Sequence, residues 1–325
     1  MSGDRGAEDV VRAAKMSLDQ HPNLRLILVG DPELLRDLVD RLIGDDDRVT
    51  IEPASQVVEM SEAPVDALRR KKDSSMRVAI NLVKDGRAQA CVSAGNTGAL
   101  MATAKFVLKM LPGINRPAII AEVPAIGGSV HMLDLGANTS CDPQQLFQFA
   151  VMGSIVAGDI SNIDNPRIAL LNIGEEDTKG HDAIRDAAGL LKSSGLNYVG
   201  FIEGNEIFSG KADVVVTDGF TGNVALKTME GTAGLARHYL RRAFTRNLLS
   251  RLVALVALPV LNRLRREMDS RNYNGASLVG LNGIVIKSHG SADAHAFQHA
   301  IETALVEVKN QVPMQIGNLL EREAA

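Results

Sequence analysis

Short apolar runs alternate with amphipathic segments along most of the chain. The runs are rich in Val, Ile and Leu and end at turn residues, which is typical of buried strands. They predict strands at 24–29, 49–52, 90–92, 118–123, 130–135, 168–172, 198–202, 213–217 and 284–286. The segments between them predict helices at 8–18, 33–42, 143–157, 181–193 and 292–312, and two more within 61–84 that are joined near Ser74, a suitable N-cap.

This order of elements is typical of a doubly wound α/β sheet with helices on both faces. At 325 residues the chain is long enough for one large α/β domain or two smaller ones, and we expect one domain over 1–325. The strands at 118–123 and 130–135 flank Gly127 and Gly128 and can pair as a hairpin outside the main parallel order.

A loop rich in Gly and Asn follows four of the predicted strands. These loops are Ser93–Ala99, Gly136–Asn138, Asn172–Glu176 and Asp218–Asn223. Because the carboxyl ends of parallel strands meet at one edge of a sheet, we expect the loops to form one polar pocket. In the last loop the helix is expected to begin at about Val224, with unpaired amides facing the loop. Such a pocket suits phosphate.

Side chains in and near these loops are candidates for chemistry. Lys179 lies among acidic residues before a helix, where it is equally well an exposed charge or a catalytic ammonium. Asn96, Asn138 and Asn223 can each hold an oxyanion or phosphate, or only form a turn. His289 follows the strand at 284–286 and can act as an acid or base, cap a helix or lie at an interface.

The composition argues against several classes of protein. The formal net charge is -4, aromatic residues make up 3% and Trp is absent, so no nucleic-acid binding surface is expected. The chain has two cysteines, Cys91 and Cys141, which indicates a reducing compartment and structural roles. No secretory leader is visible after Met1, and we expect a cytoplasmic protein.

The familiar signatures of cofactors and metals are missing. No G-x-G-x-x-G motif opens a βαβ unit, and the segment from Gly174 to Gly180 lacks the ending of a P-loop. His295 and His299 are spaced four apart on a predicted helix, but Ala296 stands where a zinc protease has Glu, so a surface pair is favoured. We therefore expect no cofactor and no metal.

An apolar run between clusters of arginine changes the pattern at 237–271. The run from Leu248 to Leu261 is too short to cross a bilayer and is interrupted by Arg251 and Pro259, so it predicts two antiparallel amphipathic helices. A dimerisation or packing hairpin and a contact with a membrane or an acidic partner are equally favoured. The candidate contact residues are Arg241, Arg246, Leu252, Leu255, Arg263 and Arg265.

Four motifs carry a resemblance to a known family. They are Ser93–Ala99, Leu170–Glu176, Asp218–Gly231 and Ile286–Gly290. Together they closely resemble the bacterial phosphate acyltransferases, which make acyl phosphate from fatty acyl-[acyl carrier protein] and inorganic phosphate. The resemblance covers nearly the whole chain in order.

The resemblance implies the entry reaction of bacterial phospholipid synthesis, with acyl carrier protein and inorganic phosphate as partners. It also implies a Rossmann-like αβα sandwich similar to the isocitrate/isopropylmalate dehydrogenase fold, with the hairpin at 237–271 inserted in it. A homodimer, peripheral attachment to the membrane and a membrane glycerol-3-phosphate acyltransferase downstream are further expectations.

The same resemblance marks site residues. Lys179 and Asn223 match positions expected to be essential, and His289 or water is expected to protonate the leaving thiol. The expected substrate and phosphate contacts are Ser93, Gly95, Asn96, Thr97, Gly98, Asp134, Asn138, Asn172, Glu175, Asp218, Gly219, Gly222 and Lys287.

The first residues depart from the family pattern. Family members open with a strand that leads into Met-Gly-Gly-Asp, whereas here Met1, Ser2, Gly3 and Asp4 stand at that place with no strand before them. The sequence predicts either a fold that starts with a helix or a sheet that lacks an edge strand. The loop is expected to border the same crevice.

Three other functions fit part of the pattern. A short-chain phosphotransacetylase that uses coenzyme A shares the chemistry but gives the basic hairpin no task. A dehydrogenase of the related fold would need a nicotinamide site and usually a divalent metal. A membrane-attached scaffold would bind the carrier protein without phosphate-dependent release of a thiol.

Overall fold

The computed structural model describes residues 3–267 and 269–323, without the side chains of 264–267, 270 and 323. The helices are α1 (Ala7–Gln20), α2 (Pro32–Leu42), α3 (Pro64–Arg70), α4 (Ser75–Lys84), α5 (Thr97–Leu108), α6 (Pro143–Ser161), α7 (Asp182–Lys192), α8 (Gly219–Thr245), α9 (Leu248–Glu267), α10 (Ala294–Asn310) and α11 (Val312–Glu323). Two short 3-10 helices are η1 (Gly204–Glu206) and η2 (Ser270–Tyr273).

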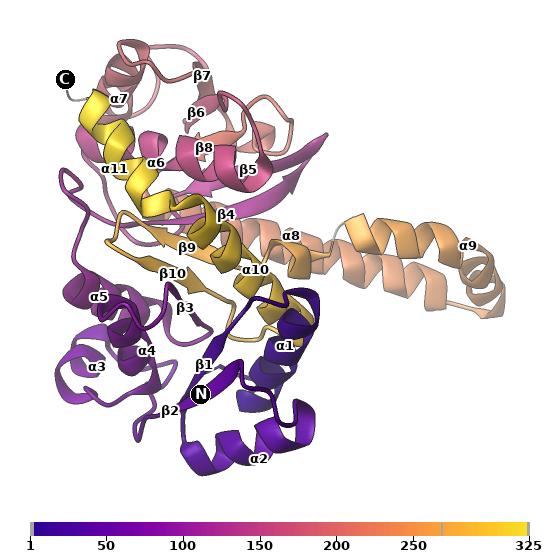
Figure 1. Cartoon of the computed structure of the whole chain (residues 1–325). Coiled ribbons are helices and arrows are strands. Elements are labelled where there is room, and N and C mark those ends of the chain that lie inside the picture. The colour runs from indigo at the N-terminus through magenta and orange to yellow at the C-terminus, as the bar shows by residue number, and fades with distance from the viewer. Residues whose placement is uncertain (1–2, 268, 324–325) are drawn as a thin grey trace.

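The strands form one large sheet and one small one (Figure 1). The strands are β1 (Leu26–Gly30), β2 (Val49–Pro53), β3 (Ala90–Ser93), β4 (Ala118–Ala125), β5 (Gly128–Leu133), β6 (Ile168–Leu171), β7 (Tyr198–Ile202), β8 (Val214–Val216), β9 (Ala276–Val279) and β10 (Ile284–Lys287). β1 and β2 pair in parallel, and the other eight run in the order β3-β10-β9-β4-β5-β8-β6-β7.

The directions of the strands correct the prediction of one parallel edge. β10 pairs antiparallel with β9, β9 with β4, and β4 with β5, whereas β3 is parallel to β10, and β8, β6 and β7 are parallel to β5. Three antiparallel steps therefore separate β3 and β10 from β5, β8 and β6. β3 and β10 therefore run opposite to β5, β8 and β6, so the loops that follow them do not leave from one common row of strand ends.

Helices cover both faces of the large sheet, as the α/β prediction requires. On one face, α6, α7 and α11 pack against β4, β5, β6 and β8 in a core that includes Phe149, Leu170 and Ile316. On the other face, α8 packs near Met132 and Val215, and α4 and α5 pack near Val285. α6 is hydrophobic nearly all round and its middle is fully buried, which places it in the centre of the molecule.

Several local predictions are confirmed and two are wrong. Ser74 is the N-cap of α4 and accepts a hydrogen bond from the Arg77 amide, and the strands at 118–123 and 130–135 pair as an antiparallel hairpin. The predicted closing helix is two helices, because Gln311 takes a left-handed backbone conformation (φ 53°) between α10 and α11. The strand β9, which inserts between β4 and β10, has only four residues and was not predicted.

Helices α8 and α9 form a hairpin that projects from the body (Figure 1). Within the described residues no single helix is long and apolar enough to cross a bilayer, and α8 and α9 meet that test only as a pair bent by 116°. The first arm does not begin at 237 as predicted, because α8 is continuous from Gly219 to Thr245. The hairpin is thus a direct extension of the helix that starts in the Asp218 loop.

A buried carboxyl group on α10 makes the stability depend on pH. Glu307 is 2% exposed, and burial raises its pKa from 4.5 to about 7. The folded chain therefore binds a proton that the unfolded chain has released, so this group's contribution is full below pH 4.5 and is lost as the pH rises through 7. The loss amounts to about 3 kcal/mol at most.

We expect Glu307→Gln to remove this loss, since glutamine does not ionise. Urea unfolding at pH 5 and pH 8 measures it: the unfolding free energy of the original chain should fall more between these values than that of the variant. Glu302→Gln, at a half-buried position on the same helix, is the matched control and should behave like the original chain. Equal pH dependence in the Glu307→Gln variant and the original chain would show that Glu307 is not protonated in the fold.

Candidate functional site

The predicted site residues fall into two groups, which follow strands that run in opposite directions in the large sheet. The loops 134–138, 172–180 and 218–223 follow β5, β6 and β8, and we call them the Asn223 cluster. We call the loops 93–98 and 287–290, together with Gly3 and Asp4, the Lys287 cluster. Among the described residues, hydrogen bonds run within each cluster and none joins the two.

Asp134 organises the Asn223 cluster from the inside. Its side chain is fully buried and accepts hydrogen bonds from the amides of Ile119, Gly136, Ala137 and Asn138, at 2.8 to 3.2 Å. The Asn138 side chain donates to Asp134 and to the Pro117 carbonyl, both at 2.8 Å. The prediction that Asp134 and Asn138 contact substrate is corrected, because these bonds occupy both side chains inside the loop.

Glycines let α8 begin against this loop. A Cβ on Gly219 would lie 2.6 Å from the Asn138 carbonyl oxygen and 2.8 Å from an Asp134 carboxylate oxygen, and one on Gly222 would overlap the Asp134 backbone. Asp218 caps the helix by accepting from the Thr221 amide at 2.9 Å. The predicted start near Val224 is therefore wrong by five positions.

That earlier start changes the role of Asn223. The amides of Gly219, Thr221 and Gly222 are already bonded to Asn138, Asp218 and Asp218 respectively, and the amides near 224 lie inside the helix. Asn223 lies in the second turn with an exposed side chain, beside Gly136. The side-chain amide of Asn223 is therefore one group that this loop offers to a ligand.

The loop after β6 brings Lys179 to the same edge. β6 and β8 are neighbours in the sheet, with Leu170 opposite Val216, so Asn172 and Lys179 follow strand ends next to Asp218. The Asn172 amide donates to the Lys179 carbonyl at 3.2 Å, and the Lys179 side chain is exposed. Glu175 forms an ion pair with Lys211 at 3.0 Å, which places its carboxylate in a surface network.

The Lys287 cluster is built from three segments that are far apart in sequence. The Ser288 amide donates to the Ser93 carbonyl at 2.9 Å, and the Asp4 amide donates to the Gly290 carbonyl at 2.8 Å. The Gly3–Asp4 loop, which was expected to border the crevice, therefore lies against the loop 287–290. Lys287 is 8% exposed and donates to the Ser288 carbonyl.

The Lys287 ammonium lacks full compensation for its burial. Desolvation lowers its pKa to about 8; the Asp4 carboxylate opposes this shift and the positive charge of Lys227 adds to it. Lys227 is exposed, pairs with Glu230 at 2.8 Å and lies on α8 one turn after Asn223. The first turns of α8 therefore lie near both clusters. Asn223 and Lys227 are four residues apart, which places them on the same side of this helix.

Comparison with known proteins decides the family. The model for the family described as fatty acid synthesis protein matches residues 1–315. The phosphate acyltransferase of Alkalilimnicola ehrlichii is 59% identical over 322 residues, which is 99% of this chain and 94% of that protein. The phosphate acyltransferase of Nitrosococcus oceani is 57% identical over 322 residues, which is 99% of this chain and 95% of that protein. The chain belongs to the phosphate acyltransferase family. It is therefore an enzyme, an acyltransferase.

Solved structures show how this phosphate acyltransferase family member is folded. A phosphotransacetylase from Streptococcus pyogenes superposes with a TM-score of 0.61 at 21% identity, over 93% of this chain and 91% of that one. The EutD phosphotransacetylase from Staphylococcus aureus gives a TM-score of 0.59 at 16% identity, over 94% and 91%. At these identities the likeness establishes a shared α/β fold.

Within the Lys287 cluster, the residues differ in what they offer a ligand. Asn96 is the N-cap of α5: its oxygen accepts from the Ala99 amide at 3.0 Å, and its amide donates to the carbonyls of Met60 and Glu62 at 2.8 and 3.0 Å. Its predicted contact with phosphate is corrected to a supporting role. Gly98 must be glycine, because a Cβ would lie 2.9 Å from the Pro64 ring.

Other residues predicted to contact substrate or phosphate also belong to the Lys287 cluster. The Ser93 hydroxyl accepts from the Gly95 amide at 3.2 Å, and Thr97 begins α5. His289 is exposed, with its Nδ1 2.8 Å from the Ser291 hydroxyl, so its ring is free to reach a group in solution. Among the described residues no group of His, Cys, Asp and Glu is placed to hold a metal, and His295 and His299 contact η2 and Asn274 instead.

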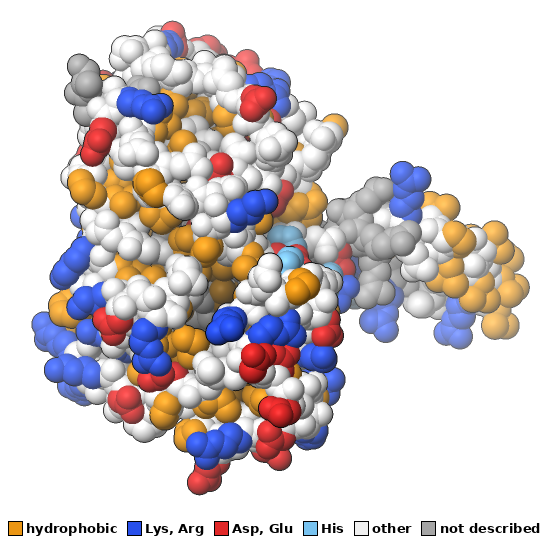
Figure 2. Space-filling view, in the orientation of Figure 1, with side chains coloured by type: hydrophobic (Ala, Val, Ile, Leu, Met, Phe, Trp, Pro, Cys, Tyr) orange, Lys and Arg blue, Asp and Glu red, His pale blue; other side chains and the backbone are white. Residues whose placement is uncertain are grey.

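The residues predicted to contact a membrane or the carrier lie on the projecting hairpin. Leu252 and Leu255 are 59% and 62% exposed, and the side chains of Arg241, Arg246 and Arg263 are exposed as well. Figure 2 shows hydrophobic side chains gathered at the far end of the hairpin, with basic side chains nearer the body. The Arg265 side chain lies outside the described residues. The apolar run on α9 is exposed and does not pack against the body.

Proposed function

We propose that the chain transfers a fatty acyl group from acyl-[acyl carrier protein] to inorganic phosphate. A phosphate oxygen attacks the thioester carbonyl, the new carbon–oxygen bond forms as the carbon–sulfur bond breaks, and the carrier leaves as a thiolate that takes up a proton. The products are acyl phosphate and free carrier protein. This would be the first committed step toward phosphatidic acid.

The observation that carries the proposal is the uncompensated charge at Lys287. A buried ammonium whose pKa is held near 8, with Lys227 as a second cation nearby and Asp4 as the opposing charge, favours an added anion. The N-terminus of α5 at Thr97 and the glycine backbone of the same cluster add partial positive charge. Inorganic phosphate fits these groups in charge and size.

Residues of the Asn223 cluster would act on the thioester. The exposed amide of Asn223 is a donor for the oxyanion that forms as phosphate attacks, and the exposed Lys179 ammonium lessens the repulsion between phosphate and that oxyanion. Because α8 rises about 6 Å over the four residues from Asn223 to Lys227, one substrate can span the two clusters along this helix. His289 or bound water returns the proton to the thiolate.

The hairpin suggests where the reaction takes place. We propose a cytoplasmic homodimer that attaches peripherally to the membrane through the apolar surface of α9 and passes acyl phosphate to a membrane glycerol-3-phosphate acyltransferase. Exposed Leu252 and Leu255 beside the arginines of α8 support a contact with anionic lipid. Acyl carrier protein would approach the same basic surface.

A short-chain phosphotransacetylase is the second candidate, favoured by the shared fold with two phosphotransacetylases. Offering long-chain acyl-[acyl carrier protein] and acetyl-coenzyme A side by side at fixed phosphate separates the two. We expect thiol release from the carrier substrate to exceed release from acetyl-coenzyme A at least tenfold, by roughly the binding energy of a long apolar chain. A preference for acetyl-coenzyme A would overturn the proposal.

A further inference from the structure

The segment after the hairpin is fastened to the start of α10. α9 ends at Glu267, and η2 follows it within a few residues. The Arg271 guanidinium bonds both carboxylate oxygens of Asp269 and reaches Asp293 at 3.2 Å. Asp293 is the N-cap of α10 and accepts from the Ala296 amide at 2.9 Å. The polypeptide between the hairpin and β9 is therefore held against α10 immediately before Asn274.

Asn274 joins this segment to the Lys287 cluster. Its side-chain amide donates to the Ser288 hydroxyl at 2.9 Å and to the Ala296 carbonyl at 2.7 Å. Its side-chain oxygen accepts from the His289 amide at 2.9 Å. The two ends of one short side chain thus hold α10 and the loop 287–290 at the same time.

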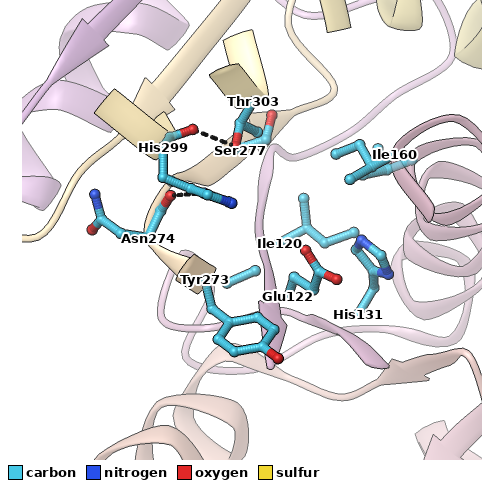
Figure 3. A pocket seen from close by; sticks show the side chains of 12 residues that line it. Ile120, Glu122, His131, Ile160, Tyr273, Asn274, Ser277, His299 and Thr303 are labelled. Carbon is cyan, nitrogen blue, oxygen red and sulfur yellow. Dashed lines mark hydrogen bonds between the residues drawn. The ribbon is translucent and has the colours of Figure 1, made fainter. Parts of the chain in front are cut away.

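His299 holds Asn274 from behind. The Nδ1 of His299 lies 2.9 Å from the Asn274 carbonyl oxygen, and because that oxygen can only accept, Nδ1 carries the hydrogen. The Thr303 hydroxyl donates in turn to the His299 carbonyl at 3.1 Å. Figure 3 shows both bonds, with Asn274 and His299 on one side of a pocket and Glu122 and His131 on the other.

Packing does not fill the space beside these two residues. The cavity between them and Glu122 is about 20 Å³, room for one water molecule. His131 lines the same cavity, is 1% exposed and has no hydrogen-bond partner for either ring nitrogen among the described residues. Since no close-packed wall supports Asn274 on this side, its hydrogen bonds decide where it lies.

We propose that Asn274, held by His299, is a positioning residue that sets the geometry of the 287–290 loop for phosphate binding. The proposal rests on the proposed function in one respect, that this loop holds phosphate. Asn274 acts on the ligand only through the loop: it fixes the Ser288 side chain and the His289 backbone, and the Lys287 ammonium is bonded to the carbonyl of the same Ser288. Asn274 was not among the site residues predicted from the sequence.

The test replaces the donor while keeping the shape. Asn274→Asp is isosteric, retains the oxygen that accepts from His289 and loses both donated bonds. Asn282→Asp is the matched control, because Asn282 donates in the same way to the carbonyls of Leu108 and Met110, at 3.3 and 2.8 Å, before the other end of β10. We expect Asn274→Asp to raise the KM for inorganic phosphate about tenfold with kcat changed less, and Asn282→Asp to leave that KM within about twofold.

A second pair of variants keeps the test independent of the folding of Asn274→Asp. His299→Asn places a donor near the position of Nδ1 and should keep the phosphate KM near its original value, whereas His299→Phe keeps the ring but removes the donor and should raise that KM. Equal KM values in the two His299 variants, or in the Asn274→Asp and Asn282→Asp variants, would overturn the positioning role.

A readout that needs no turnover separates this proposal from the proposed function. Competitive amine labelling of Lys287, followed by mass spectrometry across a pH series, reports the pKa of its ammonium. Loosening the loop lets water reach Lys287, so the pKa should rise from about 8 toward its usual 10.5 in His299→Phe and not in His299→Asn, a pair that adds no charge near Lys287. An unchanged Lys287 titration overturns the positioning role. A shifted titration with an unchanged phosphate KM shows that the loop is positioned but does not hold phosphate, which overturns the phosphate part of the proposal.

Discussion

Replacing Lys179 or Asn223 with alanine is expected to lower kcat for phosphate-dependent thiol release by on the order of a hundredfold, as the loss of one preorganised donor usually does. Both side chains are exposed at the edge of the sheet where β6 and β8 end, so neither substitution removes buried packing. The KM for phosphate should change less than kcat, because the proposed reaction has phosphate held chiefly by the Lys287 cluster. Initial rates with acyl-[acyl carrier protein] at saturating phosphate measure the effect.

Two controls share the chemistry of these changes without touching the site. Lys15→Ala removes a lysine of α1 that pairs with Asp19 at 2.7 Å, and Asn197→Ala removes an asparagine bonded to the Asn165 carbonyl. Both should retain nearly full turnover. If Lys179→Ala and Asn223→Ala release thiol at nearly the original rate, neither residue takes part in the mechanism.

Changing Leu252 and Leu255 together to glutamate should release the protein from anionic vesicles. Burying each leucine in a lipid interface contributes about 1.5 to 3 kcal/mol to binding, and the added negative charges repel anionic lipid. The affinity for the vesicles should therefore fall by at least about a hundredfold. Co-sedimentation with phosphatidylglycerol vesicles measures the partition. Turnover of soluble substrate should stay largely intact, because the apolar run lies far along the hairpin from Asn223.

The matched control places the same charges on the body. Leu34 and Val65 are 45% and 57% exposed and lie on α2 and α3, so Leu34→Glu with Val65→Glu changes charge and apolar surface in a similar way. This variant should bind vesicles as the original chain does. If the Leu252 and Leu255 variant also binds unchanged, the hairpin contacts protein only.

The sequence predicted the class of the fold because strand and helix signals are local. Apolar runs such as 168–172 and the N-cap at Ser74 depend on neighbouring residues, and the structure confirms them. The direction of each strand depends on pairings far apart in sequence. β9 is short, begins immediately after Gly275 and inserts between β4 and β10, so the sequence did not reveal that β3 and β10 run opposite to β5, β6 and β8.

The same limit explains the site. Gly/Asn loops were recognised as special, but the pattern did not distinguish side chains that build the loop from those that face a ligand. Asp134 and Asn96 stabilise the loops themselves, because they form hydrogen bonds with the backbone of Ile119 and Met60, elsewhere in the chain. Lys227 and Asn274 were not predicted as site residues, because their partners lie far away in sequence. The charge of Lys227 acts on Lys287, and Asn274 donates to Ser288.

The central claim is that inorganic phosphate attacks an acyl thioester bound to this chain. The most direct measurement is the release of free carrier-protein thiol from long-chain acyl-[acyl carrier protein] as inorganic phosphate is titrated, with acyl phosphate trapped by hydroxylamine in parallel. We predict that thiol appears only with phosphate, saturates as phosphate rises and matches the trapped acyl phosphate one to one. Carrier binding without phosphate-dependent thiol release would contradict the proposed reaction and favour a scaffold that binds the carrier protein.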